Sequence, residues 1–301
     1  MTADRAQRRR RLKRWVIAGA VVAVLLVAGV VFNTVGNYRG WTVKRVNPEA
    51  LSDLLSPDYR VMRPEGDGPF PTALLFSGCD GPHDNMVRWA EALVADGWAA
   101  VIVDSHAPRG FDDLEAWRLV CIGQILTGAE RAGDVLVSLA DARAMPFVDP
   151  DRMALIGMSH GGWSIMDLLA LESRDRLPLN LTRAPGVDDD PPLAAVKAVV
   201  LVYPWCGPTN RAADDGWTHD APVLFVLADD DMIAPAADCR AVAATLEEMG
   251  RSVEIESFAG VTHGFDQQAR AVPSTLVFDA AATAQALRRA IDFLDTATAA
   301  R

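Results

Sequence analysis

The chain has 301 residues, half of them hydrophobic, and a formal net charge of −11. This length and composition allow one sizeable core, and a single α/β domain of about 250 residues is within the usual range. Residues 1–33 hold seven basic residues and one acidic residue, so residues 34–301 hold 22 basic and 39 acidic residues, a net charge of −17. This balance argues against nucleic acid or an anionic lipid surface as a partner of the main part of the chain.

A basic segment at the start of the chain leads into an apolar run. Seven Arg and Lys residues between Arg5 and Arg14 precede the uncharged stretch Trp15–Phe32. As a helix, this stretch spans roughly 27 Å, close to the hydrocarbon thickness of a bilayer. Basic residues hold the N-terminal side of such a helix in the cytoplasm. We therefore predict that residues 1–33 anchor the chain in a membrane and that the remainder is extracytoplasmic.

A cleaved signal peptide is the main alternative for this segment. The apolar region of a signal peptide usually has about 7 to 15 residues and ends in an A-x-A-like site. The run here is longer and offers only the poor match Val27-Ala28-Gly29. The pattern favours an uncleaved anchor over cleavage, and a buried helix is the least favoured reading.

Residues 34–57 contain Gly, Asn and Pro, are typical of a tether, and precede an expected catalytic domain at 58–301. In that domain, apolar runs alternate with segments of helical periodicity, which predicts a mostly parallel sheet with helices on both faces. The fold class is therefore α/β. The expected strands are Tyr59–Met62, Thr72–Phe76, Ala99–Asp104, Arg152–Ile156, Val196–Tyr203, Val223–Ala228 and Val253–Phe258, and the expected helices include Asn85–Ala95, Ala129–Ala144, Ala236–Met249 and Thr275–Ala297.

One long connection interrupts this alternation. Residues 173–193 contain four prolines and the acidic run Asp188–Asp190. A connection of this length is either a mobile surface loop or a lid over the substrate. Because it is mostly polar and lacks an amphipathic helix, we expect a surface loop.

The motif Gly-Met-Ser-His-Gly at residues 157–161 joins a predicted strand to a predicted helix. A sharp turn flanked by glycines holds the central serine hydroxyl in an exposed, strained elbow, as a nucleophile requires. A serine hydroxyl is activated by a neighbouring base, which a third group orients. An acidic cluster, Asp229–Asp231, and then His263 follow two later strands. Serine, acid and histidine thus occur in the order expected of an α/β-hydrolase triad.

Several further segments resemble the dienelactone hydrolase family of α/β-hydrolases, from about Thr72 to Gln268. The segments that carry the resemblance are Leu74–Gly81, Val103–Gly110, Tyr203–Cys206, Asp231–Pro235 with Cys239, and His263–Asp266.

The resemblance implies that the catalytic acid stands four residues before Pro235, which is Asp231, with Asp230 in reserve. Dienelactone hydrolase itself uses a cysteine nucleophile, so its lactone specificity does not carry over to a chain with Ser159. The α/β-hydrolase fold supplies oxyanion donors from two backbone amides, which map to Cys79 and His160. No cofactor is required for this chemistry.

The four cysteines, Cys79, Cys121, Cys206 and Cys239, allow three pairings among which the sequence does not choose. None has C-x-x-C spacing. His83, His106 and His160 offer a metal-site alternative, but their spacing matches no metal motif, so no metal is expected. Cys79 is more plausible as a structural thiol or disulfide than as a second nucleophile.

Arg109 could bind a substrate carboxylate, although an ion pair with Asp112 or Asp113 is the favoured reading. Trp163 is expected in the core, while Trp205 and Trp217 suit either the core or an acyl pocket.

These patterns predict a membrane-anchored serine hydrolase that cleaves small-molecule carboxylic esters, including lactones as a possibility. A peptidase or amidase on the same scaffold is the first alternative, because the leaving group is not visible in the sequence. The second alternative is a catalytically idle envelope-binding module. The acyl and alcohol groups of the substrate and the oligomeric state are left open.

Overall fold

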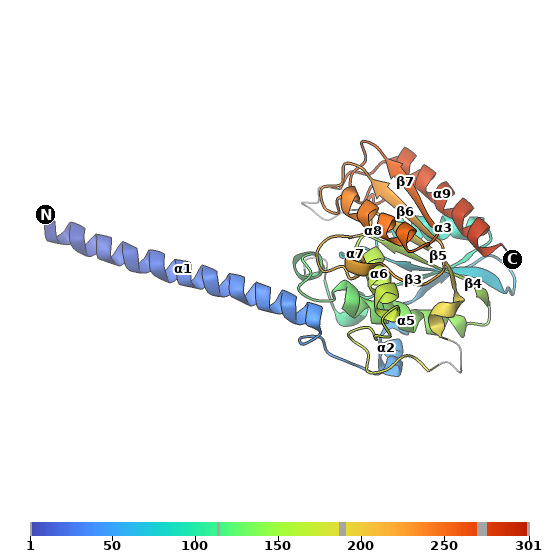
Figure 1. The fold of residues 1–301 in the computed structure, drawn as a ribbon, viewed down its shortest axis with the longest axis horizontal. Coiled ribbons are helices and arrows are strands. Elements are labelled where there is room, and N and C mark those ends of the chain that lie inside the picture. The colour runs from blue at the N-terminus through green and yellow to red at the C-terminus, as the bar shows by residue number, and fades with distance from the viewer. Residues whose placement is uncertain (1, 113–114, 187–190, 270–275, 300–301) are drawn as a thin grey trace. The chain divides into compact units, whose positions relative to one another are not determined.

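The structure is a computed structural model that describes residues 2–112, 115–186, 191–269 and 276–299 (Figure 1). The chain divides into two compact units, Met1–Val43 and Lys44–Arg301.

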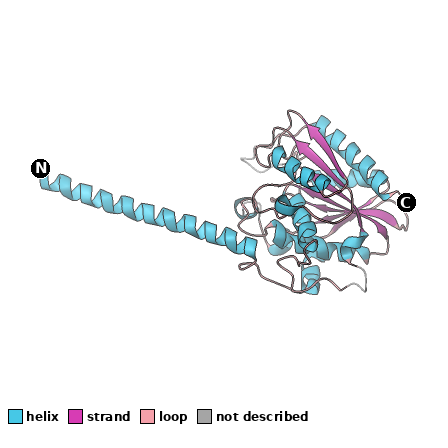
Figure 2. Ribbon diagram, in the orientation of Figure 1, coloured by secondary structure: helices cyan, strands magenta, loops and turns pink. Residues whose placement is uncertain are grey.

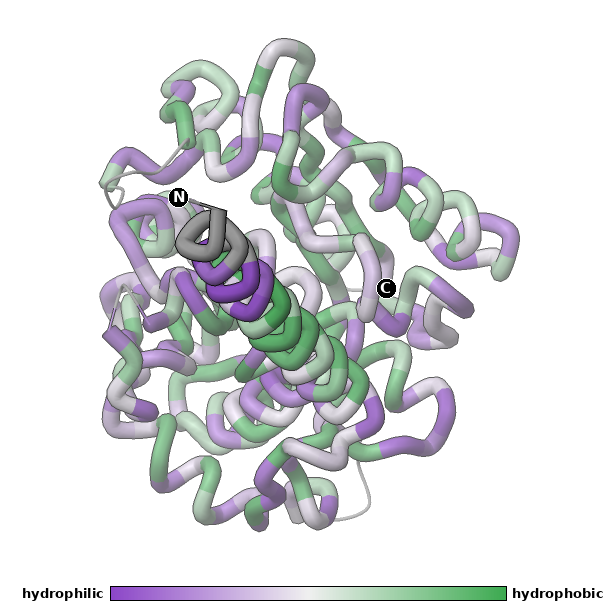
Figure 3. The backbone as a smooth tube through the Cα atoms, turned by 90° about the vertical axis from the view of Figure 1, so that its left-hand side faces the viewer, coloured by the Kyte–Doolittle hydropathy of each residue, from purple (hydrophilic) through white to green (hydrophobic). Residues whose placement is uncertain are grey.

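The first unit is a single long helix, α1 (Thr2–Arg39). Its stretch Arg10–Arg39 has a mean hydropathy of 2.8 over its most apolar window, and none of that window is buried. Figure 3 shows hydrophilic turns near the N-terminus followed by a continuous hydrophobic stretch along this helix. The helix is therefore long and apolar enough to cross a membrane, by length and composition.

The second unit is a twisted sheet with helices on both faces (Figure 2). Its strands are β1 (Arg60–Met62), β2 (Phe70–Phe76), β3 (Ala99–Val103), β4 (Val148–Met158), β5 (Val196–Val202), β6 (Val223–Ala228) and β7 (Val253–Phe258). Its α-helices are α2 (Pro48–Leu55), α3 (Asp84–Ala95), α5 (Gly128–Arg143), α6 (His160–Glu172), α7 (Ala212–Asp215), α8 (Ala236–Glu248) and α9 (Ala280–Thr298). Short 3-10 or π turns occur at Ser56–Asp58, Ala107–Arg109, Ala116–Val120 and Pro192–Ala195.

The strand order is β1-β3-β2-β4-β5-β6-β7. Among the described strands, β1 runs antiparallel to its neighbour β3, and all the other neighbouring strands pair in parallel. The order reverses between β2 and β4, and open α/β sheets generally bind ligands beyond the carboxyl ends of the strands at such a reversal. The predicted fold class is confirmed.

Successive residues of the central strands serve opposite faces of the sheet. On β2, Ala73 and Leu75 join a core that includes Trp89 of α3 and Ala286 of α9. Helices α5 and α6 pack together on the other face. Strands that are buried on both faces have continuous apolar sequences, which is why the sequence predicts them.

Apart from shifted boundaries, such as a helix that begins at Ala280 where Thr275, which lies outside the described residues, was expected, two segments differ in structure from the sequence expectation. Within the expected tether, residues 48–55 form a helix because the Asn47 side chain accepts a hydrogen bond from the Ala50 amide and Pro48 occupies the first turn. Leu51 and Leu55 bury the inner face of this helix.

The connection at residues 173–193 is not only a surface loop. Leu179, Asn180 and Leu181 are buried. The Leu179 amide donates to the Ala129 carbonyl of α5, and Leu181 forms an isolated bridge with Val46. Two leucines flanking a polar residue supply the apolar area that ties this segment down. The acidic run at 188–190 lies outside the described residues.

Candidate active site

Ser159 lies in the turn between β4 and α6. Its backbone has φ 50° and ψ −112°, a conformation that few residues with a side chain adopt. The turn is tight because glycines let strand and helix approach closely. A Cβ on Gly157 would lie 2.5 Å from the Gly162 nitrogen, and one on Gly161 would lie 2.2 Å from the Phe76 carbonyl oxygen. The strained elbow expected from the sequence is present, and Ser159 is only half-buried.

The structure brings His263 and Asp231 to Ser159. Both hydrogen bonds of His263 are short: Nε2 lies 2.9 Å from Ser159 Oγ, and Nδ1 lies 2.6 Å from Asp231 Oδ2. A carboxylate only accepts hydrogen bonds, so Nδ1 carries a proton and Nε2 is left to accept the Ser159 hydroxyl. This arrangement can take a proton from the serine during nucleophilic attack.

Of the three adjacent aspartates, only Asp231 contacts the imidazole. Its other oxygen, Oδ1, accepts hydrogen bonds of 2.8 Å from the backbone amides of Ile233 and Ala234. Asp229 is exposed and pairs with Arg240, while Asp230 is exposed. The two backbone amides hold the Asp231 carboxylate in one orientation toward His263.

The loop that carries His263 is held against the core by a buried polar network. The Tyr203 ring packs edge-on against the His263 ring, with 4.8 Å between centroids. The Tyr203 hydroxyl donates to Asp266 Oδ1 at 2.5 Å, and Trp89 Nε1 donates to Asp266 Oδ2 at 2.7 Å. Burial raises the pKa of Asp266, and the hydrogen bonds from Tyr203, Trp89 and Asn85 oppose that shift.

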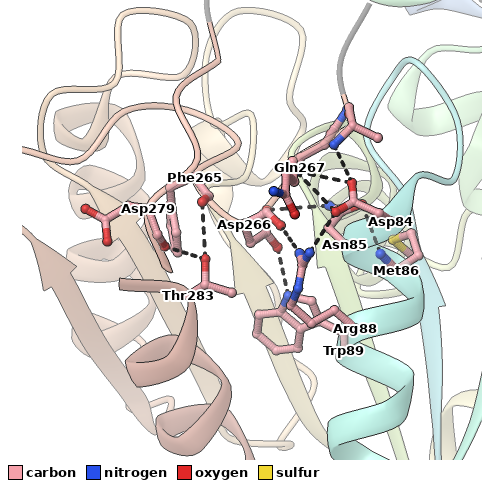
Figure 4. Close-up of polar contacts among 12 residues, drawn as sticks. Asp84, Asn85, Met86, Arg88, Trp89, Phe265, Asp266, Gln267, Asp279 and Thr283 are labelled. Carbon is pink, nitrogen blue, oxygen red and sulfur yellow. Dashed lines mark hydrogen bonds and ion pairs between the residues drawn. The ribbon is translucent and has the colours of Figure 1, made fainter. Parts of the chain in front are cut away.

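Figure 4 shows side chains of helix α3 in contact with the segment that follows His263. Arg88 donates to the Asp266 carbonyl, and Asn85 Nδ2 lies 3.5 Å from Asp266 Oδ1. Asp84 accepts hydrogen bonds from the amides of Gln268 and Ala269. The histidine loop is therefore fixed at several points by side chains from one amphipathic helix.

The two residues proposed to supply oxyanion amides lie beside the nucleophile. His160 is the first residue of α6, where backbone N–H groups have no partner within the helix. Cys79 lies in the loop after β2, and a Cβ on the preceding Gly78 would lie 3.8 Å from the Ser159 Cβ. Both segments thus flank Ser159, as a site for a developing oxyanion requires.

Sequence reasoning did not single out Arg131, which is fully buried beneath the loop after β2. Its Nη1 donates to the Ser77 carbonyl at 2.8 Å and lies 3.3 Å from His160 Nδ1. The helical periodicity of α5 places this residue on the inner face, but a charged residue at such a position carries no signal of function by itself.

The other two histidines considered for a metal site, His83 and His106, contact different partners. His83 Nε2 lies 3.0 Å from Asp80 Oδ2, and His106 Nε2 donates to the Cys79 carbonyl at 3.0 Å. Burial, together with the nearby Arg131, lowers the pKa of His106 to about 3. Within the described ranges, no group of three or more His, Cys, Asp or Glu side chains is placed to hold a metal ion.

Arg109 makes an ion pair, but with a different partner from those expected. Its guanidinium contacts both oxygens of Asp134 on α5, at 3.0 and 2.8 Å. Asp112 instead accepts a hydrogen bond from the amide of Glu115, and Asp113 lies outside the described residues. A partner 25 residues away is brought near by packing of α5 and is not visible as local spacing.

The tryptophans are divided between core and surface. Trp163 and Trp217 are buried, which agrees with a core role for Trp163, whereas Trp205 is half-buried next to the elbow. The amide of Trp205 donates to the Ser159 carbonyl at 3.2 Å.

Two disulfides settle the pairing of the four cysteines. Cys79 bonds to Cys121, and Cys206 bonds to Cys239. Cys79 is therefore not a free thiol, which excludes it as a second nucleophile in this state. Each disulfide links a loop beside the site to another segment. Cys79–Cys121 links the loop after β2 to residue 121, and Cys206–Cys239 links the loop after β5 to α8.

Comparison with known proteins finds similar sequences and similar folds. Residues 191–298, which include Asp231 and His263, match the dienelactone hydrolase family. A putative dienelactone hydrolase from Klebsiella pneumoniae subsp. pneumoniae has a similar structure, with a TM-score of 0.59 and 18% identity over 78% of this chain and 91% of its own. The chain is therefore similar to dienelactone hydrolases over residues 191–298, and its second unit has an α/β-hydrolase-like fold.

The second unit also resembles a thermophilic esterase from the planctomycete Thermogutta terrifontis. That structure has a TM-score of 0.55 and 16% identity, covering 79% of this chain and 86% of its own. At such identities the likeness shows the fold alone.

A curated relative is acylamino-acid-releasing enzyme 1 of Oryza sativa subsp. japonica, which is 26% identical over 220 residues. The match covers 65% of this chain but only 28% of the rice protein, so the chain spans about a quarter of the length of that relative.

Proposed function

We propose that residues 58–301 form a serine hydrolase that cleaves small-molecule carboxylic esters, lactones included, through an acyl-enzyme on Ser159. The observation that carries the proposal is the continuous contact from Asp231 through His263 to Ser159, at 2.6 and 2.9 Å. The similarity to an esterase fold is consistent with this chemistry. No cofactor takes part in the proposed reaction.

In this mechanism, Ser159 Oγ attacks the ester carbonyl while His263 Nε2 takes the hydroxyl proton. Asp231 holds the imidazole in the required tautomer and stabilises the imidazolium. The amides of Cys79 and His160 donate to the oxyanion of the tetrahedral intermediate. The intermediate collapses when the alcohol leaves with the proton from His263. Water, activated by the same histidine, then hydrolyses the acyl-enzyme and releases the carboxylic acid.

A covalent probe tests the nucleophile directly. The full-length protein in detergent is treated with a fluorophosphonate, and hydrolysis of p-nitrophenyl esters of graded chain length is measured. We expect labelling and turnover in the wild type and neither in Ser159→Ala. Ser138→Ala is the matched control, because Ser138 is a fully buried serine that bonds the Val135 carbonyl within α5. Equal labelling of wild type and Ser159→Ala would remove Ser159 from the mechanism.

Peptide hydrolysis is the second candidate, favoured by the match to acylamino-acid-releasing enzyme 1. The acyl-transfer machinery would be the same, with an amine as leaving group in place of an alcohol. Turnover of N-acylated aminoacyl amides without turnover of p-nitrophenyl esters would select this alternative. A folded wild type that neither reacts with the probe nor turns over either class would instead indicate a non-catalytic envelope-binding module.

We further propose that α1 is an uncleaved anchor with its N-terminus in the cytoplasm and the hydrolase on the opposite side. The apolar helix, the basic residues before it and the two disulfides support this placement. Protease added to intact cells should then digest the hydrolase unit. N-terminal sequencing of the membrane-bound protein should yield residues before Trp15, whereas a start after Phe32 would indicate signal-peptide cleavage.

A further inference from the structure

Arg131 is an unusual charge for a protein core. Its side chain, on α5, is fully buried and contacts the loop after β2. Burial lowers the pKa of Arg131 to about 10, and Asp134 opposes that shift, so the guanidinium is charged at neutral pH. A buried charge is costly unless its donors are satisfied, which makes the identity of its partners informative.

Those partners include residues of the two segments on either side of the nucleophile, and also Ser105 Oγ, which accepts from Arg131 Nε at 3.0 Å. On the loop after β2, Arg131 Nη1 donates to the carbonyls of Ser77 and Gly78, at 2.8 and 3.4 Å. Its Nη2 donates to Ser77 Oγ at 3.2 Å. On the elbow, the same Nη1 lies 3.3 Å from His160 Nδ1. One side chain thus touches both segments from which the proposed oxyanion amides come.

The protonation state of His160 fits this contact. Burial and the charge of Arg131 lower the pKa of His160 well below its usual range, so the ring is neutral. A guanidinium only donates, which leaves Nδ1 as the acceptor and assigns the ring proton to Nε2. Arg131 therefore orients the His160 ring at the first turn of α6.

Peptide planarity links the carbonyl contacts to the oxyanion amide. The Gly78 carbonyl and the Cys79 N–H belong to the same planar peptide unit and point in opposite directions. When Arg131 holds the Gly78 carbonyl toward α5, the Cys79 N–H is turned away from α5. The Cys79 carbonyl is held in turn by His106 Nε2, and the Cys79 side chain is held by its disulfide.

We propose that Arg131 is a positioning residue that sets the direction of both oxyanion donors, the amides of Cys79 and His160. It does so through the Ser77 and Gly78 carbonyls on one side and the His160 ring on the other. This inference rests on the hydrolase function proposed above. Arg131 itself touches no reacting atom, and its effect is transmitted through the backbone that it holds.

The test compares Arg131→Lys with Arg109→Lys, a matched control. Arg109 is also an arginine that contacts Asp134 and Ser105, because its guanidinium donates to the Asp134 carboxylate and to the Ser105 carbonyl. For each variant, kcat and KM are measured on p-nitrophenyl acetate, together with the Ki of an aryl trifluoromethyl ketone, whose tetrahedral adduct with Ser159 places an oxyanion between the same donors. Near-UV circular dichroism establishes that each variant is folded.

We expect Arg131→Lys to lower kcat by about 10- to 100-fold, somewhat less than the loss of a whole oxyanion donor, and to change KM little. The Ki of the ketone should rise by the same factor as kcat/KM falls, which a purely structural role would not produce. Arg109→Lys should lower the thermal midpoint but leave both kinetic quantities near wild type.

Two milder variants keep the inference testable if Arg131→Lys does not fold. Ser77→Ala and Ser105→Ala each remove a hydroxyl that accepts from the guanidinium, at 3.2 and 3.0 Å, and leave Arg131 in place. Both should lower kcat and raise the ketone Ki in parallel. The inference is overturned if folded Arg131 or serine variants keep wild-type values of both, or if Arg109→Lys loses kcat equally. Absence of any wild-type turnover would overturn the hydrolase proposal itself.

Discussion

Tyr203→Phe removes one hydroxyl from the network beneath His263 and leaves the ring in place. That hydroxyl donates to Asp266 Oδ1 at 2.5 Å, and both side chains are buried, with Asp266 fully so. After the substitution, Asp266 retains the Trp89 hydrogen bond at 2.7 Å, while Asn85 Nδ2 lies at 3.5 Å. One oxygen of a buried carboxylate thereby loses its short hydrogen bond, and the lost oxygen atom leaves only a small void.

A hydrogen bond to a charged group contributes about 1.5 to 3 kcal/mol to stability. We therefore expect Tyr203→Phe to lower the free energy of unfolding by about 2 kcal/mol, which corresponds to a fall of about 4 to 8 °C in Tm for a domain of this size. Because the ring still packs against His263, kcat should change little.

The sign of the pH dependence follows from the raised pKa of Asp266. The Tyr203 hydrogen bond favours the ionised carboxylate, so its removal raises the pKa of Asp266 further. A group whose folded pKa lies above its unfolded value loses stability as pH rises, and the variant loses more. The difference in stability between wild type and variant should consequently be larger near pH ~8 than near pH ~4.

Urea unfolding followed by tryptophan fluorescence at both pH values measures these differences. Tyr59→Phe is the matched control, because the Tyr59 hydroxyl donates to the carboxylate of Asp141 at 2.8 Å in a half-buried setting. We expect the control to lose less stability and to keep full activity. A Tyr203→Phe protein as stable as wild type at both pH values would refute this account of the network, as would a difference that grows toward acid.

Three further predictions concern the elbow, the acid and a buried carboxylate. Asp231→Asn should lower kcat by about 10²- to 10⁴-fold, because the His263 imidazole is no longer held in the required tautomer. Asp230→Asn should match the wild type in the same ester assay. Gly161→Ala should lower the free energy of unfolding by about 1 to 3 kcal/mol, because its Cβ would lie 2.2 Å from a backbone carbonyl of β2, while Gly186→Ala should be neutral in the same denaturation experiment. Burial raises the pKa of Asp167 to about 7, so between pH 4 and 7 this carboxyl is ionised only in the unfolded state. The free energy of unfolding of the wild type should therefore fall by a few kcal/mol as the pH rises from 4 to 7. Asp167→Asn should flatten that loss, and unfolding curves that keep the wild-type slope against pH would contradict it.

Much of the fold was predictable because apolar runs and helical periodicity in the local sequence indicate the strands and helices. The strands at 223–228 and 253–258 have the bounds expected from their apolar runs, and α8 differs from expectation by one residue. The helix at 48–55 was missed because a short polar-capped helix has little periodicity of its own. Its boundaries depend on the Asn47 cap and on burial of Leu51 and Leu55.

The candidate site divides in the same way. The elbow around Ser159 is a local motif, because glycines at fixed positions permit its backbone conformation. The choice of Asp231 among three adjacent aspartates came from a family resemblance and not from the residues themselves. The buried position of Arg131 had no sequence signal, since arginine in a helical pattern is usually exposed.

The sequence by itself determined the features that depend on neighbours along the chain: the long apolar helix, the alternation of strands and helices, the elbow and the order of serine, acid and histidine. Tertiary structure alone decided which distant groups meet. It selected the pairing of the cysteines, gave Arg109 its partner Asp134 and placed Arg131 between two loops. Such contacts depend on strand order and helix packing, which bring together residues separated by tens of positions, and no local spacing encodes them.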